Sequence, residues 1–144
     1  MATLSAPKPI TRLRPRTALL LAAATIVAVL LNAGAAAVAI SLGAPADFGP
    51  LSVPAQALFS VIGITVGWIG WRLVRARAKN PRRVLAVLVP AVLVASFVPD
   101  VLLVAFPVIP GSNPPAILGL MVMHVIVAAC AVAAYVAADR AAAP

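Results

Sequence analysis

Residues 71–83, WRLVRARAKNPRR, decide the fold of this chain, because they hold six of its eleven lysine and arginine residues. On either side lie long segments that are almost free of charge. The whole sequence is 64% hydrophobic and 10% charged, whereas a soluble domain is nearer half apolar and a quarter charged. Polar groups are too few to cover the apolar surface in water, so the sequence predicts an integral membrane protein.

The apolar segments are each long enough to cross a hydrocarbon layer of ~30 Å as a helix. We expect spans at residues 17–42, 52–74, 81–106 and 115–138, a basic tail at 1–16, a basic hinge at 72–83 and a short tail at 139–144. The predicted fold class is an all-α, four-helix transmembrane bundle.

The distribution of charge predicts the orientation of the bundle. The leader and the hinge carry ten of the eleven cations, and the proline-rich loops at 43–51 and 107–115 carry none. By the positive-inside rule, both termini and the hinge are cytoplasmic, in a bacterial cytoplasmic membrane. The hinge cations are expected to set topology and to contact anionic lipid headgroups rather than nucleic acid: Arg72, Arg75, Arg77, Lys79, Arg82 and Arg83.

The first span has a competing interpretation as a cleaved signal peptide. Residues 32–37, NAGAAA, follow a basic leader and an apolar run, as a small-residue cleavage site would. The apolar run continues to Leu42, which favours a retained helix. Cleavage would leave the rest of the topology unchanged.

Local signals place the helix ends. Ser52, Asn80 and Asn113 are suited to cap the second, third and fourth spans. Trp68 and Trp71 lie where an interfacial aromatic belt is expected.

Prolines interrupt the third predicted span. Pro90 and Pro99 each remove a backbone hydrogen bond, so kinks are expected there. The hydroxyl of Ser96 is well placed to satisfy a freed carbonyl.

Two ionisable residues lie inside predicted spans, where an aspartate costs about 2.5–3.5 kcal/mol. Helical rise places Asp100 and His124 at about 9 and 13 Å below the outer boundary. We hypothesise a buried polar cluster at this depth, centred on these two residues and completed by Asn32, Ser60 and Gln56. Two roles remain open: structural contacts that fix helix packing, or a site for a ligand, an ion or a proton.

Three further features of the sequence are weaker signals. Gly63 and Gly67 form a GxxxG pattern suited to close helix packing, inside the bundle or at a dimer face. Asp47 and Asp139 are expected to be solvated loop residues, and Cys130, the only cysteine, to be a small packing residue.

The sequence contains no motif that indicates an enzyme. A single histidine excludes an HExxH motif, and no phosphate-binding loop or nucleophile elbow is present. We therefore expect a protein that is not an enzyme and that uses no metal or cofactor.

Several short stretches together resemble a family of small actinobacterial four-span membrane proteins catalogued as a domain of unknown function. They are Asn32, residues 46–48 (ADF), 82–84 (RRV), 96–100 (SFVPD) and 120–129 (LMVMHVIVAA). The resemblance implies the fold class and a plasma membrane, and supplies no activity. It also implies that Asn32, Asp47, Asp100 and His124 match polar positions of the family.

Two functions follow as alternatives. The first is a non-enzymatic accessory or scaffold protein of the envelope, whose polar layer orders the bundle. The second is a small proton- or ion-linked transporter, or a ligand-binding membrane protein, that uses Asp100 and His124. Four spans are few for a transporter, so the second function would need a dimer. The partner that we expect, besides lipid, is a second copy of the chain or another membrane protein.

Overall fold

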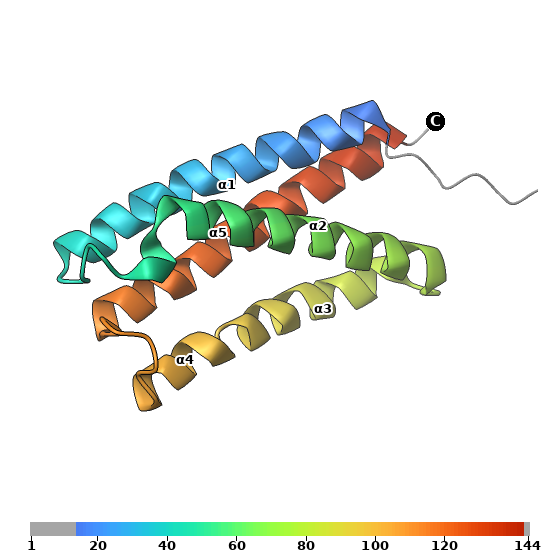
Figure 1. Ribbon diagram of the computed structural model, residues 1–144. Helices are drawn as coiled ribbons and strands as arrows, with labels where there is room; N and C mark the ends of the chain where they lie inside the picture. Colours follow the sequence, from blue (N-terminus) through green and yellow to red (C-terminus); the bar gives the residue numbers. More distant parts are fainter. Residues whose placement is uncertain (1–13, 143–144) are drawn as a thin grey trace, which may run out of the picture.

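The computed structural model describes residues 14–142, and most of the predicted basic tail at 1–16 lies outside this range. The described elements are α1 (Pro15–Ser41), η1 (Gly49–Leu51), α2 (Val53–Arg77), α3 (Pro81–Ser96), α4 (Val98–Ala105) and α5 (Pro114–Ala142). Taking α3 and α4 together, four helices are long and apolar enough to cross a membrane. The predicted all-α, four-helix transmembrane bundle is confirmed (Figure 1).

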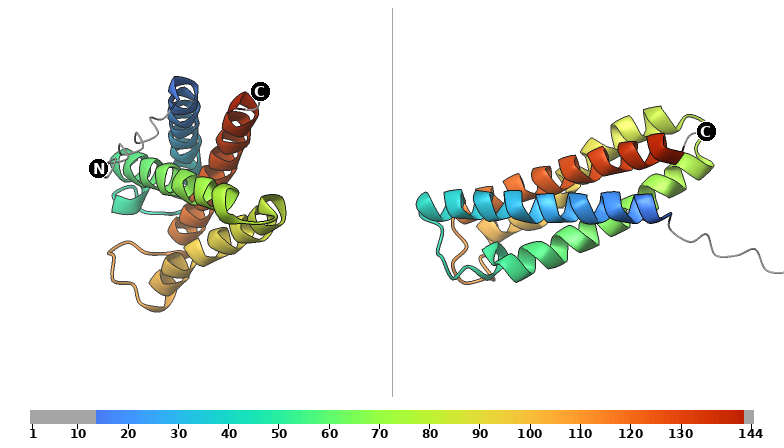
Figure 2. Two further views of the ribbon diagram at one scale, coloured as in Figure 1. Left: turned by 90° about the vertical axis from the view of Figure 1, so that its right-hand side faces the viewer. Right: turned by 90° about the horizontal axis from the view of Figure 1, so that it is seen from above.

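The spans alternate in direction, so the basic segments gather at one end of the bundle. The start of α1, the connection between α2 and α3, and the end of α5 lie together at that end (Figures 1 and 2). The two proline-rich loops lie at the other end. The connection after α2 is only residues 78–80, because Arg72, Arg75 and Arg77 are still helical.

Asparagine side chains cap two of the helices. Asn80 Oδ1 accepts a hydrogen bond from the Arg83 amide at 3.4 Å. Asn113 Oδ1 accepts from the Ala116 amide at 3.0 Å, and its Nδ2 donates to the Gly43 carbonyl at 2.8 Å. The cap of α5 therefore also ties the two proline-rich loops together. Ser52 precedes α2, but its side chain makes no capping hydrogen bond.

Small residues bring α1 and α5 into close contact along their length. A Cβ atom added to Gly119 would lie 2.8 Å from Cβ of Ala39, closer than such atoms can approach. In lipid, where apolar side chains gain nothing from leaving water, this close packing drives helix association. Ala28, Asn32 and Ala36 are spaced by four residues and are all buried, so this spacing marks the face of α1 that packs inside the bundle.

Most of the buried apolar residues form two clusters, one towards each end of the bundle. The hinge-end cluster consists of Ala28, Ile64, Trp68, Ala131, Ala134, Tyr135 and Ala138. The loop-end cluster consists of Ala36, Ala39, Ala44, Phe48, Leu51, Ala116 and Met123. The predicted polar positions Asn32, Ser60 and His124 fall between the two clusters in sequence.

The third predicted span, residues 81–106, is not one continuous helix. It breaks at Phe97, and Pro99 lies in the first turn of α4, where its missing amide costs least. Ser96 Oγ donates to the Leu93 carbonyl at 2.6 Å, which satisfies a group that the break frees. Pro90 lies inside α3 without ending it.

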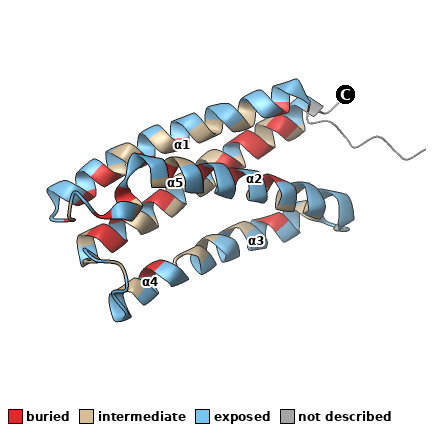
Figure 3. Cartoon of the chain, viewed as in Figure 1, coloured by how far each residue is buried: buried red, intermediate tan, exposed pale blue. Residues whose placement is uncertain are grey.

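Helices α3 and α4 stand away from the other three spans (Figure 2). Within them only Leu85 and Asp100 are buried. Exposed residues occur along every helix (Figure 3), and many of them are large and apolar, such as Leu30, Phe59 and Val87. These faces suit contact with lipid.

Candidate functional site

Asp100 and His124 form a pair between α4 and α5. Oδ2 of Asp100 lies 3.2 Å from Nδ1 of His124. Asp100 is only 5% exposed, whereas the His124 side chain is 37% exposed. The break before α4 also presents the Phe97 ring edge-on to the imidazole, with 6.1 Å between the ring centroids. The two ionisable residues that were predicted at the centre of the polar cluster are thus in direct contact.

The shorter contact of His124 is with its own helix. Nδ1 lies 2.9 Å from the Leu120 carbonyl oxygen, and because a carbonyl only accepts, Nδ1 carries a proton. This N–H points to the carbonyl, so Oδ2 of Asp100 gains electrostatic attraction but no well-aligned hydrogen bond. Helix α5 thereby holds the imidazole in the orientation that faces Asp100.

A second polar contact joins α1 to α2. Nδ2 of Asn32 donates to Oγ of Ser60 at 3.3 Å, and both residues are buried. Gln56, one turn earlier on the same face of α2, donates from Nε2 to the Leu51 carbonyl at 2.6 Å. Gln56 therefore closes the turn that leads into α2.

The two contacts lie at about the same depth but are separate. Helices α2 and α5 run in the same direction, and Gly63 faces Val127. Ser60 and His124, each three residues earlier, are therefore level with one another. No hydrogen bond between the described residues links the Asn32 contact to the Asp100 contact. The hypothesis of one connected cluster is replaced by two contacts in one polar layer.

The glycines of the GxxxG pattern face α5 rather than the outside of the bundle. A Cβ on Gly67 would lie 2.5 Å from the Tyr135 hydroxyl, and one on Gly63 would lie 3.4 Å from Val127. The Tyr135 hydroxyl donates to the Ile64 carbonyl. Gly67 thus makes room for a tyrosine that bonds to the backbone of α2.

Asp139 is not the solvated loop residue that we expected. It lies on α5, and its Oδ2 accepts a hydrogen bond from Trp71 Nε1 at 2.9 Å and lies 3.2 Å from Nε of Arg75. Packing of Tyr135 and Ala138 extends α5 beyond the predicted end of the span. The contacts of Asp139 join the end of α5 to the end of α2.

The two tryptophans are also placed differently from the prediction. Trp68 is buried and Trp71 half-buried, and each ring lies 5.4 Å from the Tyr135 ring. They therefore pack inside the bundle instead of forming a belt around it. The Arg72 guanidinium lies 5.7 Å from the Trp68 ring centroid, where a cation is attracted to the aromatic face.

The other predicted positions are placed as follows. Asp47 is exposed in the first proline-rich loop, and Cys130 is half-buried against the hinge-end cluster. The six cations of the predicted hinge, on the end of α2, the connection and the start of α3, are all exposed: Arg72, Arg75, Arg77, Lys79, Arg82 and Arg83. Among residues 14–142, no group of three histidine, cysteine or acidic side chains is arranged to hold a metal ion.

The chain belongs to a family of unknown function, DUF6069, whose match covers residues 8–141. No similar curated protein and no similar solved structure was found. The family match agrees with the resemblance noted from the sequence, and it assigns no activity.

Proposed function

We propose that this integral membrane protein of a family of unknown function is a non-enzymatic accessory or scaffold subunit of the bacterial envelope. Its polar layer sets the positions of the helices relative to one another. The layer lies between the two apolar clusters. Contacts between small residues alone would allow one helix to slide along its neighbour and change register. Polar contacts at a defined depth are suited to fix that register.

The observation that carries this proposal is the pairing of polar side chains across helices. Asn32 contacts Ser60 across α1 and α2, and Asp100 contacts His124 across α4 and α5. Each contact would be lost if one helix shifted by a turn. A structural role explains both contacts, and also why α4, which buries little else, is held by Asp100.

We further propose that the basic end of the bundle faces the cytoplasm. Two exposed positions at opposite ends, Asp47 and Lys79, allow this to be tested in a Cys130→Ala background. In intact cells, an impermeant maleimide is expected to label Asp47→Cys, and to label Lys79→Cys only after lysis. The reverse pattern of labelling would contradict this orientation.

A second candidate function is proton or cation handling at the polar layer. Three buried oxygens, Oδ1 of Asn32, Oε1 of Gln56 and Oδ2 of Asp100, accept no hydrogen bond from the described residues. All three are acceptors, which a cation or a proton donor would satisfy. The broken helix beside Asp100 resembles the interrupted spans at which transporters bind ions.

A flux measurement separates the two candidates. Wild-type protein and Asp100→Asn are reconstituted into liposomes that carry a pH gradient, and the decay of the gradient is followed with an enclosed dye. The scaffold proposal predicts that both decay at the rate of empty liposomes. Faster decay with wild-type protein, abolished by Asp100→Asn, would replace it with the second candidate.

A further inference from the structure

Helix α4 is held to the rest of the bundle through very few groups. Of its eight residues only Asp100 is buried, and α5 is the helix that it packs against. The backbone before α4 is interrupted at two positions. The Phe97 amide bonds back only three residues, to the Val94 carbonyl at 3.2 Å, and Pro99 has no amide. Helix α4 can therefore turn about Phe97 with little loss of backbone hydrogen bonding.

The contact that holds α4 against α5 is electrostatic. Oδ2 of Asp100 lies 3.2 Å from Nδ1 of His124, but the proton on Nδ1 is directed to the Leu120 carbonyl at 2.9 Å. Oδ2 of Asp100 accepts no hydrogen bond from the described residues. The attraction therefore comes from charge, and it depends on the protonation of both groups.

The polar layer around this pair is otherwise uncharged in the part of the chain that the structure describes. From α1 and α2 the layer contains amide and hydroxyl side chains, which do not titrate: Asn32, Ser60 and Gln56. The break before α4 contributes the Phe97 ring. Cys130 and Tyr135, the other titratable side chains of the middle of α5, pack in or against the hinge-end cluster.

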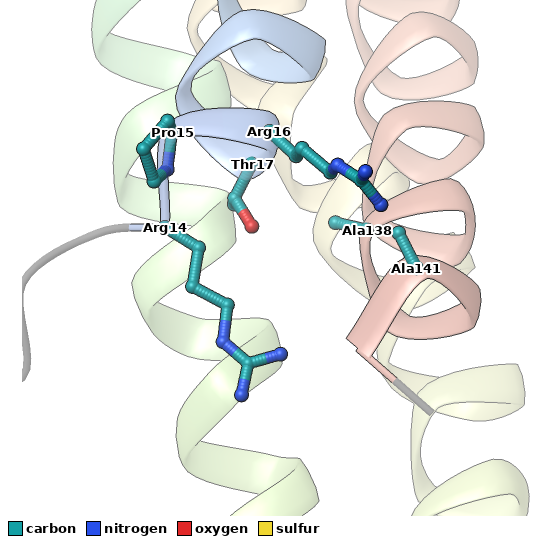
Figure 4. A pocket seen from close by; sticks show the side chains of 6 residues that line it. All are labelled: Arg14, Pro15, Arg16, Thr17, Ala138 and Ala141. Atoms are coloured by element: carbon teal, nitrogen blue, oxygen red, sulfur yellow. The ribbon is translucent and has the colours of Figure 1, made fainter. Parts of the chain in front are cut away.

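The remaining charged groups of residues 14–142 lie away from the pair. Asp47 is exposed in the first proline-rich loop, and Asp139 is paired with Arg75 near the end of α5. Figure 4 shows Arg14 and Arg16 where α1 begins, beside the end of α5 and thus at the basic end. The other described cations are at the same end: Arg72, Arg77, Lys79, Arg82, Arg83 and Arg140. A response of α4 to pH can therefore be assigned to the pair.

We propose that Asp100 and His124 form a pH-sensitive latch that holds α4 against α5. The two groups titrate as one coupled pair, and at intermediate pH the carboxylate and the imidazolium compensate one another. Acid removes the charge of the carboxylate, and base removes the charge of the imidazolium. Either change leaves one uncompensated charge inside the membrane, where such a charge is costly. Helix α4 is thus held at intermediate pH and released on either side of it.

Release of the latch moves α4 and leaves the other spans in place. Helices α1 and α5 pack through small residues such as Ala39 and Gly119, whose contact does not change with pH. Rotation about Phe97 brings the buried carboxylate of Asp100 to the surface of the bundle. The latch goes beyond the proposed function, because a scaffold can change shape in this way without any flux of protons.

The distance between α4 and α5 tests the latch in the folded, full-length protein. Nitroxide labels are attached at Val104→Cys and Val122→Cys, both exposed positions, in a Cys130→Ala background. Double electron–electron resonance is recorded in nanodiscs of phosphatidylcholine from about pH 4 to 9. We expect one narrow distance in the middle of this range. A longer distance is expected at both ends of the range, with a population roughly tenfold higher than in the middle.

Two controls separate the latch from a general loosening of the bundle. Labels at Val38→Cys and Val122→Cys report the distance between α1 and α5, which is expected to stay constant over the same range. The variant Asp100→Asn/His124→Gln removes both titratable groups and keeps side chains of similar size. In that variant the distance between α4 and α5 is expected to be independent of pH.

The latch is overturned if the distance between α4 and α5 stays constant while the pair is intact, or if the double variant still responds to pH. It is also overturned if the two label pairs change together. If circular dichroism shows that the double variant has lost helix, Asp100→Asn decides alone. The opening at alkaline pH must then disappear, because no carboxylate is left uncompensated, and its persistence would contradict the latch.

Discussion

Replacing Gly119 by valine is expected to lower the free energy of unfolding in detergent by about 2–3 kcal/mol. Even a single added Cβ would lie 2.8 Å from Ala39, so α1 and α5 would have to move apart. That movement would loosen the most extensive helix contact of the bundle and the van der Waals attraction that it supplies. Reversible unfolding in a mixed detergent, followed by circular dichroism, measures the loss.

The matched control is Gly34→Val on α1, where an added Cβ would meet nothing within 4 Å. This change is expected to be neutral or slightly stabilising, because glycine is the poorer helix former. Ala39→Gly in the Gly119→Val background should restore part of the lost stability. Equal effects at Gly119 and Gly34 would show that the contact between α1 and α5 does not depend on small residues.

Replacing His124 by leucine is expected to lower the free energy of unfolding by about 2–3 kcal/mol. The change leaves the carboxylate of Asp100, which is 5% exposed, without its partner inside the membrane. The double variant Asp100→Leu/His124→Leu should recover most of the loss, because two apolar side chains then replace both polar groups. Thermal unfolding in detergent ranks the three proteins.

The contrary result is a double variant no more stable than His124→Leu. In that case the cost would come from the lost packing of His124 against Phe97 and α5, and not from an uncompensated carboxylate.

The spans could be predicted from the sequence because length and hydropathy alone determine whether a segment crosses the membrane. The levels of the polar residues relative to one another could be predicted in the same way, since helical rise is constant. Ser60 and His124 accordingly lie level with one another. The family resemblance was confirmed as membership of a family of unknown function, while an actinobacterial source stays a prediction.

The partners of the polar residues could not be predicted, because they depend on how far each helix is rotated about its axis. Hydropathy is uninformative about rotation when a helix is apolar all round. Asn32 and Ser60 were therefore both expected to complete the hydrogen bonds of the cluster around Asp100, whereas in the structure they bond to each other. Asp139 was misplaced for a related reason: the end of α5 is set by packing of Tyr135 and Ala138, which hydropathy does not show.

The interruption of the third span was predicted only in part. Pro99 was expected to bend a continuous helix, but two helices meet at Phe97 instead. A proline can break a helix as well as bend it, because its ring clashes with the preceding turn, and the helix that follows the break places Asp100 against His124 on α5. A sequence pattern locates the proline but not the partner that reorients the following helix.

The central claim is that paired polar side chains hold the helices in position, and a double-mutant cycle on Asp100 and His124 tests it most directly. The unfolding free energies of wild type, Asp100→Asn, His124→Gln and the double variant are measured in one detergent. We expect both single variants to be less stable than wild type and the two sites to couple by about 1 kcal/mol or more. If Asp100→Asn is as stable as wild type or more stable, the charge is retained at a cost to stability, and the structural account is contradicted.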